Sequence, residues 1–589
     1  MKFRNLRKWD NVDESYGLVF LAQLVDELLF EFTLDTYKPS AMNTSLLVRE
    51  ALETIKAIES GTIKRPNLRH ILDELCENLD KDDVAKKLLS VELKGVKAVL
   101  KDPKSTESSV VTTIELLNNQ LQLDIYKSKN EELLIQEVCD SQSPASLRSL
   151  TRSYITTLLN SDFSAKHIQK QSQKFFFYST NRIAGNNAIS DYLELFSVEA
   201  EEYSVIYRAP KYLSEFKLAA RQLGITITDS LDEYVEVLRS HNFLLRRGEV
   251  YLLIPKNGSK DLYFAKSVSD RKLEQFQTLI GLYHHKEAPA PIVECLVIDS
   301  DKQKVLKATK SINPMHKCQD SKPGVAARKL AEFMSGFSMQ RDSFRKFNRS
   351  AELHALALSS ESIENQMINL WIALESLIPN KDTSNDISQI EHIASSIVPF
   401  INIGYIHKII TRLSKDLFQW DSRLIKRMLR DIPGTGVAHR LSNFLILEEF
   451  AERRLELESS FKNFHLLKDR YEYVKYLFSE PKNVVNSLDA HKIRVEWQIR
   501  RIYRARNMIV HDGVTPSYSE VLIENTHDYL DTVMSGLMIL AASQNTLDTI
   551  DQGFKMVEIN YKSYYKSLSE KGLEFEQGNI YELLFRHPI

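Results

Sequence analysis

The stretch Arg500–Gly513 constrains the fold most, because it puts a charged side chain on an apolar helix face. At roughly 100° per residue on a helix, one stripe is apolar and consists of Ile499, Ile502, Tyr503, Ile509 and Val510. Arg506 falls in the middle of that stripe. A guanidinium is almost never buried without a partner. Arg506 must therefore pair with an acid or line a cleft that admits an anion.

A second stripe of the same helix is polar. It carries, at helical spacing, Arg500, Arg504, Asn507 and His511. His511 comes near the negative end of the helix dipole, which favours a protonated imidazole. Gly513 follows, and its freedom at positive φ predicts that the helix ends there. A permanent cation, an amide and a titratable imidazole within two turns are the groups that a phosphodiester-cleaving site needs.

Two segments of the chain resemble a known family. The run from Arg506 to His511 is similar to the R-x(4–6)-H signature of HEPN domains, in the form where Asn507 follows the arginine. Upstream, Leu370–Leu377 resembles the W-x-A-L-E-x-L helix of the Apea-like HEPN subgroup. The two segments come in the order that this subgroup shows. The resemblance covers only the C-terminal part of the chain, and it implies a helical bundle there.

The resemblance also implies an activity, that of a metal-independent endoribonuclease of a toxin or antiphage-defence system. The 2′-hydroxyl of RNA would attack the adjacent phosphate. His511 would act as general acid or base, and Arg506 would stabilise charge on the phosphorane oxygens. Asn507 would orient the phosphate or hold His511, and Glu375 would hold Arg506 in one rotamer. Because one chain has one such motif, the resemblance implies a homodimer with a shared site.

Other interpretations of the same residues stay open. Arg506 could be a structural cation that Glu375 neutralises. The domain could be a catalytically silent HEPN domain that serves as a dimerisation or RNA-binding scaffold. A pure protein–protein adaptor would show no affinity for RNA at all.

Charge limits where RNA could bind. The 589 residues carry a formal net charge of −2, so the whole molecule is not an electrostatic nucleic-acid binder. A local basic patch lies just before the motif, and we expect its side chains to contact the RNA backbone: Arg500, Arg501 and Arg504. The alternative for these arginines is an ordinary solvated helix face.

Composition excludes several other classes. Four cysteines stand far apart with no CxxC pair, which suits a reducing cytoplasm. The histidines and cysteines show no metal-ligand spacing, so we expect no metal site and no cofactor. No apolar run is long enough to span a membrane. We therefore expect a cytoplasmic protein.

The pattern along the chain predicts a mainly α protein in three parts. Residues 1–170 read as a helical region, 171–322 as a small α+β domain, and 323–589 as the HEPN-type helical bundle, with a helical insertion near 381–486. In the central part, β-branched and aromatic runs predict strands, including one over 261–268. The segment Lys256–Ser259 predicts a hairpin turn.

Overall fold

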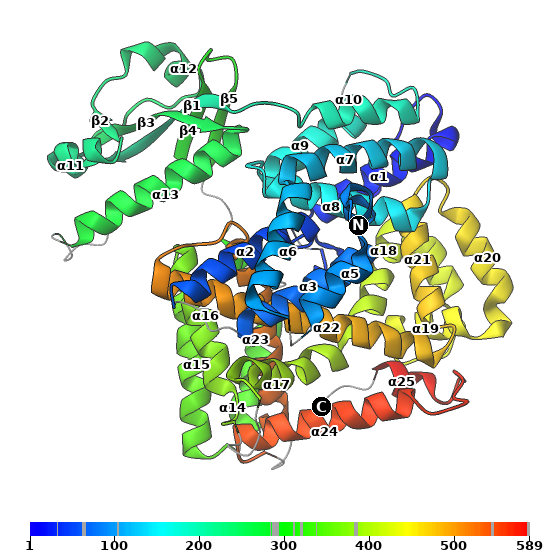
Figure 1. The fold of residues 1–589 in the computed structure, drawn as a ribbon. Helices are drawn as coiled ribbons and strands as arrows, with labels where there is room; N and C mark the ends of the chain where they lie inside the picture. The colour runs from blue at the N-terminus through cyan, green and yellow to red at the C-terminus, as the bar shows by residue number, and fades with distance from the viewer. Residues whose placement is uncertain are drawn as a thin grey trace. The chain divides into compact units, whose positions relative to one another are not determined.

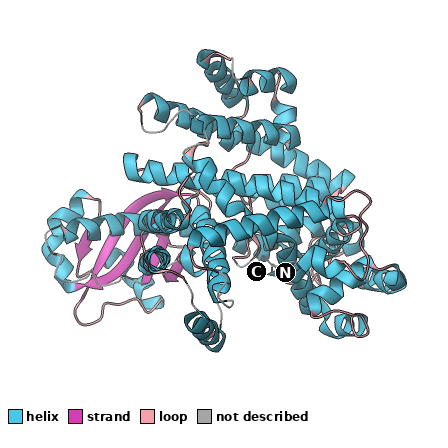
Figure 2. Cartoon of the chain, turned by 90° about the horizontal axis from the view of Figure 1, so that it is seen from below, coloured by secondary structure: helices cyan, strands magenta, loops and turns pink. Residues whose placement is uncertain are grey.

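The computed structural model describes residues 1–31, 33–61, 66–102, 105–178, 180–282, 284, 292, 294–309, 313–317, 322–336, 339–381, 387–542 and 547–585. These residues are mainly α-helical and contain one small sheet, as the sequence predicts (Figure 1). Figure 2 shows the strands gathered in that single sheet. Within the described ranges, no single helix is long and apolar enough to cross a membrane, although one bent pair, 389–403 with 405–428, passes on length and composition.

The chain divides into two compact units, residues 1–154 with 313–589, and residues 155–312. This differs from the three predicted parts, because the N-terminal and C-terminal helices pack together. The N-terminal helices of the first unit are α1 (Tyr16–Leu28), α2 (Thr44–Glu59), α3 (Pro66–Lys81), α4 (Asp83–Leu88), α5 (Leu93–Lys101), α6 (Glu107–Gln120), α7 (Leu123–Gln136) and α8 (Pro144–Leu159), whose last turn crosses the division.

The C-terminal helices of the first unit begin after a short 3₁₀ turn, η8 (Pro314–His316). They are α14 (Pro323–Gly336), α15 (Arg341–Ser359), α16 (Ile363–Leu377), α17 (Gln389–Ile403), α18 (Tyr405–Met428), α19 (Val437–Ile446), α20 (Ala451–Ser460), α21 (His465–Leu477), α22 (Pro481–Asn507), α23 (Ser519–Ala542), α24 (Ile550–Leu568) and α25 (Ile580–Phe585). Helix α22 carries Arg506 and Asn507 of the motif and the three arginines of the basic patch before it.

The apolar faces of these C-terminal helices share one core. Leu370 and Leu374 of α16 are buried there, as are Ile499 and Ile502 of α22. Each face repeats at helical spacing, so burying it against its neighbours is the main driving force for the bundle. Helix α17, which the sequence assigns to the insertion, contributes Ile397 to the same core.

The second unit contains a five-stranded antiparallel sheet in the order β2-β3-β1-β4-β5. Its elements are α9 (Ala165–Gln173), α10 (Ile189–Glu194), β1 (Glu201–Pro210), α11 (Lys217–Gln222), β2 (Thr226–Thr228), α12 (Val235–Ser240), β3 (Glu249–Ser259), α13 (Leu262–Gly281), β4 (Glu294–Asp299) and β5 (Val305–Thr309). Alternate residues of β1 face opposite sides: Val205 lies in the core with α13, and Ile206 in a smaller core on the other side.

Two predictions for the second unit are wrong. The run over 261–268 is the start of α13, because the Asp261 carboxylate accepts hydrogen bonds from the backbone N–H groups of Tyr263 and Phe264 and caps a helix. Residues 256–259 continue β3 rather than turning, and Gly258 pairs with Glu202 of β1. Turn residues predicted a hairpin there, but pairing with β1 extends the strand.

Candidate nuclease site

The motif helix ends in a single π turn, η10 (Met508–Asp512), directly after α22. Gly513 closes it with φ of 65°, and its N–H donates to the carbonyl of Met508. The predicted left-handed position of Gly513 is confirmed. A π turn has i→i+5 bonds, so it widens the helix and changes which faces its residues occupy. Val510, which a regular helix would place on the apolar stripe, is 43% exposed.

The three residues of the proposed motif differ in burial. Asn507 is buried, Arg506 is partly buried, and His511 is exposed. The Arg506 Nη1 donates a 2.9 Å hydrogen bond to the Asn507 Oδ1, so the amide orients the guanidinium. The buried Nε of Arg506 has no hydrogen-bond partner among the described residues. That donor is closed to solvent in this conformation, whereas His511 can meet a ligand from solvent.

Glu375 does not hold Arg506 in this structure. Its carboxylate accepts a 2.9 Å hydrogen bond from the indole N–H of Trp371, one turn earlier on α16. Trp371 in turn lies against the ring of Tyr503, with ring centroids 5.6 Å apart. In the described part of the chain, no acid lies within ion-pair distance of Arg506. Glu375 thus positions α16 against α22 through Trp371 rather than by pairing with the motif arginine.

Two of the three arginines expected to bind RNA are buried instead. Arg501 and Arg504 are each 3% exposed. Arg501 pairs with Glu74 of α3 at 2.6 Å and with Glu50 of α2 at 3.4 Å, and Arg504 pairs with Glu50 at 2.8 Å. The expectation of phosphate contacts fails for these two side chains in this conformation, because acids from the N-terminal helices already neutralise them.

In this cluster, burial and the neighbouring charges have opposite effects on the pKa values. Burial raises the pKa of the Glu50 carboxyl, but Arg504 and Arg501 outweigh it, so the net pKa is lowered. Burial likewise works to lower the pKa of Arg501, and Glu74 and Glu50 reverse that effect. Both partners therefore stay ionised. A buried pair of this kind costs desolvation, and losing one partner leaves an uncompensated charge.

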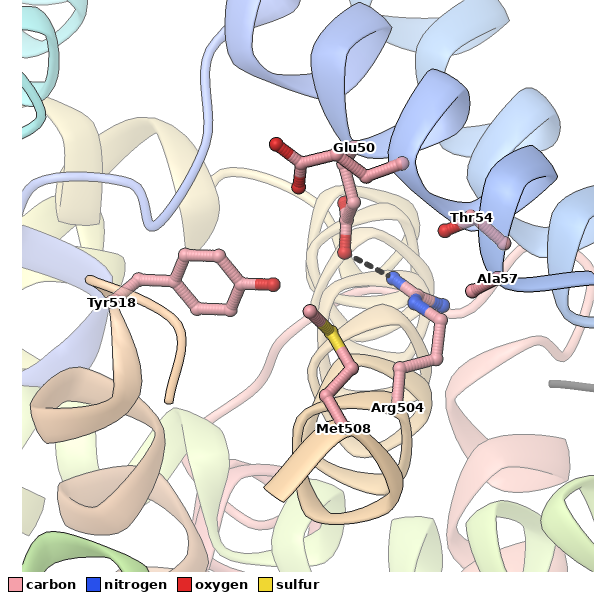
Figure 3. A pocket seen from close by; sticks show the side chains of 7 residues that line it. Glu50, Thr54, Ala57, Arg504, Met508 and Tyr518 are labelled. Carbon is pink, nitrogen blue, oxygen red and sulfur yellow. Dashed lines mark hydrogen bonds and ion pairs between the residues drawn. The ribbon is translucent and has the colours of Figure 1, made fainter. Parts of the chain in front are cut away.

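A pocket beside this cluster is lined by Glu50, Glu53, Thr54, Ala57, Arg504, Met508 and Tyr518 (Figure 3). Its only arginine is the one that already donates to Glu50. The pocket therefore offers no free cation to a phosphate. Arg500, the third predicted RNA contact, is partly buried and lies 4.0 Å from Glu496 on its own helix.

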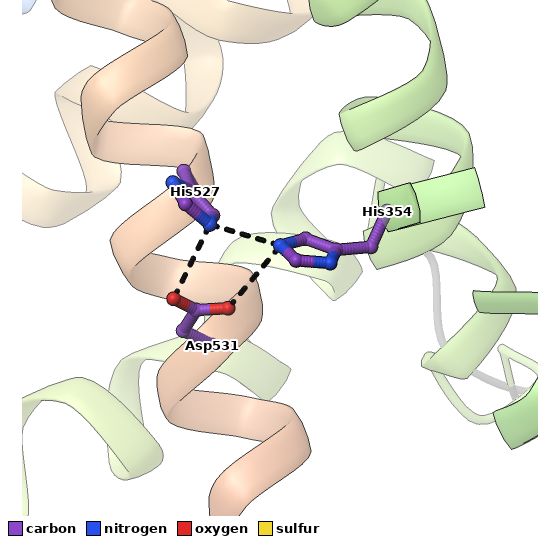
Figure 4. Close-up of side chains that lie close together, drawn as sticks. All are labelled: His354, His527 and Asp531. Carbon is purple, nitrogen blue, oxygen red and sulfur yellow. Dashed lines mark hydrogen bonds and ion pairs between the residues drawn. The ribbon is translucent and has the colours of Figure 1, made fainter. Parts of the chain in front are cut away.

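The structure also brings together three residues that the sequence analysis did not single out. His354 of α15, His527 of α23 and Asp531 of α23 point their polar atoms toward one another (Figure 4). The spacing of His527 and Asp531, one helical turn apart, is visible in the sequence and could have suggested a pair. His354 lies 173 positions away from His527, so no local pattern includes it.

The arrangement at the end of α22 combines an exposed imidazole with a guanidinium that an amide orients. These groups can exchange a proton and stabilise an oxyanion, which suits acyl or phosphoryl chemistry. No protein family, no curated protein and no solved structure matches this chain, so the assignment rests on the residues themselves.

Proposed function

We propose that this protein is a HEPN-type, metal-independent endoribonuclease. The observation that carries the proposal is the π turn at the end of α22, which leaves His511 exposed five residues after Arg506 and four after Asn507. Such π turns occur often at functional sites. The hydrogen bond that orients the Arg506 guanidinium and the exposed His511 imidazole, both near the end of one helix, support a catalytic role for this helix end.

In the proposed reaction, the 2′-hydroxyl of a ribose attacks the adjacent phosphorus and the 5′-oxygen of the next nucleotide leaves. His511 transfers a proton as general acid or base, a role that histidine side chains commonly take. Arg506 donates to the non-bridging oxygens, where negative charge grows in the transition state. Asn507 keeps the Arg506 guanidinium in one orientation by accepting its 2.9 Å hydrogen bond. The products are a 2′,3′-cyclic phosphate and a 5′-hydroxyl.

The active form in this proposal is a homodimer. Arg506 and His511 of a regular helix would lie roughly 140° apart around the axis. The π turn alters this angle but supplies no second motif. Two motif helices that meet at a two-fold axis would surround one cleft with two arginines and two histidines.

The N-terminal helices would control this nuclease, as expected of an effector in a toxin or antiphage-defence system. The support is the buried contact of Glu50 and Glu74 with Arg501 and Arg504, which fixes α2 and α3 on the motif helix. A trigger that moved α2 and α3 would expose two arginines next to the motif. Those arginines could then bind the RNA backbone.

The test is RNA cleavage by the whole chain in EDTA, with analysis of the product ends. The proposal expects cleavage to persist and the ends to carry a 2′,3′-cyclic phosphate, because neither Arg506 nor His511 needs a metal. Ends with a 5′-phosphate and a 3′-hydroxyl would overturn the mechanism.

The burial of Arg501 and Arg504 favours a second candidate, a catalytically silent HEPN domain that serves as a scaffold. With those cations neutralised, the surface near the motif loses two of its expected phosphate contacts. A silent scaffold would leave RNA intact in every buffer while it still formed dimers. RNA binding measured on the same preparation would separate an RNA-binding scaffold from one that only dimerises.

A further inference from the structure

The cluster of His354, His527 and Asp531 has the geometry of ligands around one cation. The two imidazole Nε2 atoms are 2.9 Å apart. The Nε2 of His354 lies 3.6 Å from Oδ1 of Asp531, and the Nε2 of His527 lies 3.3 Å from Oδ2. A tetrahedral zinc ion with bonds of about 2.0–2.1 Å holds its ligand atoms about 3.3 Å apart. The Nε2–Nε2 separation is shorter than that value, and the two separations to Asp531, which end on different carboxylate oxygens, lie at it and slightly beyond it.

Hydrogen bonds alone do not account for this triangle. Each Nε2 has, in the ring plane, either one lone pair or one proton, yet each faces two partners. With neutral rings, one Nε2–H can donate to the lone pair of the other Nε2 at 2.9 Å, and the Asp531 oxygens at 3.3 and 3.6 Å are then held by charge and not by a second linear hydrogen bond. A cation at the centre accepts one lone pair from each ring and one from the carboxylate, so it satisfies every group at once.

We propose that His354, His527 and Asp531 bind a divalent transition-metal ion of the zinc class. Two imidazoles with one carboxylate suit zinc or iron rather than magnesium or calcium, which prefer oxygen ligands. The ion joins α15 to α23. The His527 side chain is 4% exposed, whereas His354 and Asp531 are 25% and 45% exposed, so the site opens to solvent on one side. That side leaves a coordination position for water or another ligand.

The surroundings suit a metal site. The His527 side chain is 4% exposed, so packing holds its ring in place, and Asp531 lies one turn along the same helix. Asp528 of α23 and His316 of η8 influence the charge of His527. Asp528 lies 3.4 Å from Lys408 and contributes no atom to the triangle. It is therefore a matched control for Asp531.

The experiment measures metal binding by the whole chain without an affinity tag, stripped with EDTA and dialysed against zinc or cobalt(II). We expect one zinc per chain, a cobalt visible spectrum of nitrogen and oxygen ligands, and a higher melting temperature with zinc, because the ion binds the folded state. Asp531→Asn and His354→Ala should each lower zinc affinity more than about 100-fold, since even outer-shell changes cost 10–100-fold. Asp528→Asn should leave the affinity unchanged.

Several results would overturn the site. One is a stripped protein that takes up no zinc at micromolar concentration. Another is Asp531→Asn or His354→Ala binding zinc as tightly as the unsubstituted chain. A third is magnesium competing equally with zinc. Asp531 and His354 are partly exposed, so these variants test the site even if His527→Ala fails to fold, and circular dichroism checks each one. RNA cleavage plays no part in these measurements, so their outcome is independent of the nuclease proposal.

Discussion

Arg504 of α22 donates a 2.8 Å hydrogen bond to Glu50 of α2 across 454 positions of sequence. Arg501, one turn earlier, bonds to Glu74 of α3 at 2.6 Å across 427 positions. The helix that leads into the motif is thus tied to the N-terminal helices by buried charges. Stability of the first unit therefore depends in part on these buried pairs, which also neutralise Arg501 and Arg504 next to the motif.

Arg501→Ala should destabilise the first unit strongly. The substitution leaves Glu74 buried without its cation, which costs about 3–5 kcal/mol when a buried pair is broken. Denaturant unfolding followed by circular dichroism measures the change. Arg500→Ala is the matched control, because its long 4.0 Å pair with Glu496 lies within one helix and joins no distant segments, so its loss should cost much less. Equal unfolding midpoints for the two variants would contradict the buried role of Arg501.

Glu50→Gln should make stability less dependent on acid pH. The folded-state pKa of Glu50 is lowered from 4.5, so its stabilising effect is complete above that pH and disappears as the pH falls through the folded pKa. The difference in melting temperature between the unsubstituted chain and Glu50→Gln should therefore be constant near neutral pH and shrink below 4.5. Glu53 provides the control, because partial desolvation and the nearby Glu50 raise its pKa while its side chain stays 57% exposed. Its ionised form is disfavoured in the fold, so Glu53→Gln should give a small difference of the opposite sign.

His511→Ala should remove RNA cleavage while the fold stays intact. Loss of a general acid–base group lowers the rate by about 10²–10⁴-fold, and the exposed ring contributes little to packing. Initial rates on a labelled RNA, with the melting temperature as a folding check, measure the effect. His241→Ala, in the second unit, is the control and should cleave normally. Full activity in a folded His511→Ala chain would refute the assignment.

Gly513→Ala should impair cleavage beyond its effect on stability. Gly513 has φ of 65°, where an alanine costs about 1–2 kcal/mol, and the strain falls on the π turn that carries His511. Gly572, with φ of 74°, is an open left-handed position in a different loop and serves as the control. Both variants should lose similar stability, but only Gly513→Ala should lose cleavage rate. Equal cleavage rates for the two variants would show that the π turn is not needed for function.

A shared site predicts that inactive chains disable active ones. Mixed with an excess of His511→Ala chains, the unsubstituted chain should lose more activity than its dilution accounts for. The same excess of His241→Ala chains should cause no such loss. Light scattering and rates measured over a range of concentrations should follow one dimerisation curve. A strictly monomeric protein with full specific activity would refute the composite site.

Much of the secondary structure could be predicted because it depends on neighbouring residues. Helices α16, α22 and α23 follow from apolar spacing that repeats within each segment, and Gly513 ends the motif helix because it accepts positive φ. The π turn was not predictable, since regular helical spacing assumes 3.6 residues per turn. The start of α13 was missed because β-branched and aromatic residues follow a capping aspartate, and the cap outweighs their strand preference.

The sequence by itself therefore determined the mainly helical class, the apolar faces and the candidate motif Arg506–Asn507–His511. Only the tertiary structure decided that Arg501 and Arg504 pair with Glu50 and Glu74, that Glu375 bonds to Trp371, and that His354 meets His527 and Asp531. The physical reason is the distance along the chain over which each effect acts. Periodicity and capping act within a few residues, whereas the partner of a buried charge or a ligand is chosen by packing between helices far apart in sequence.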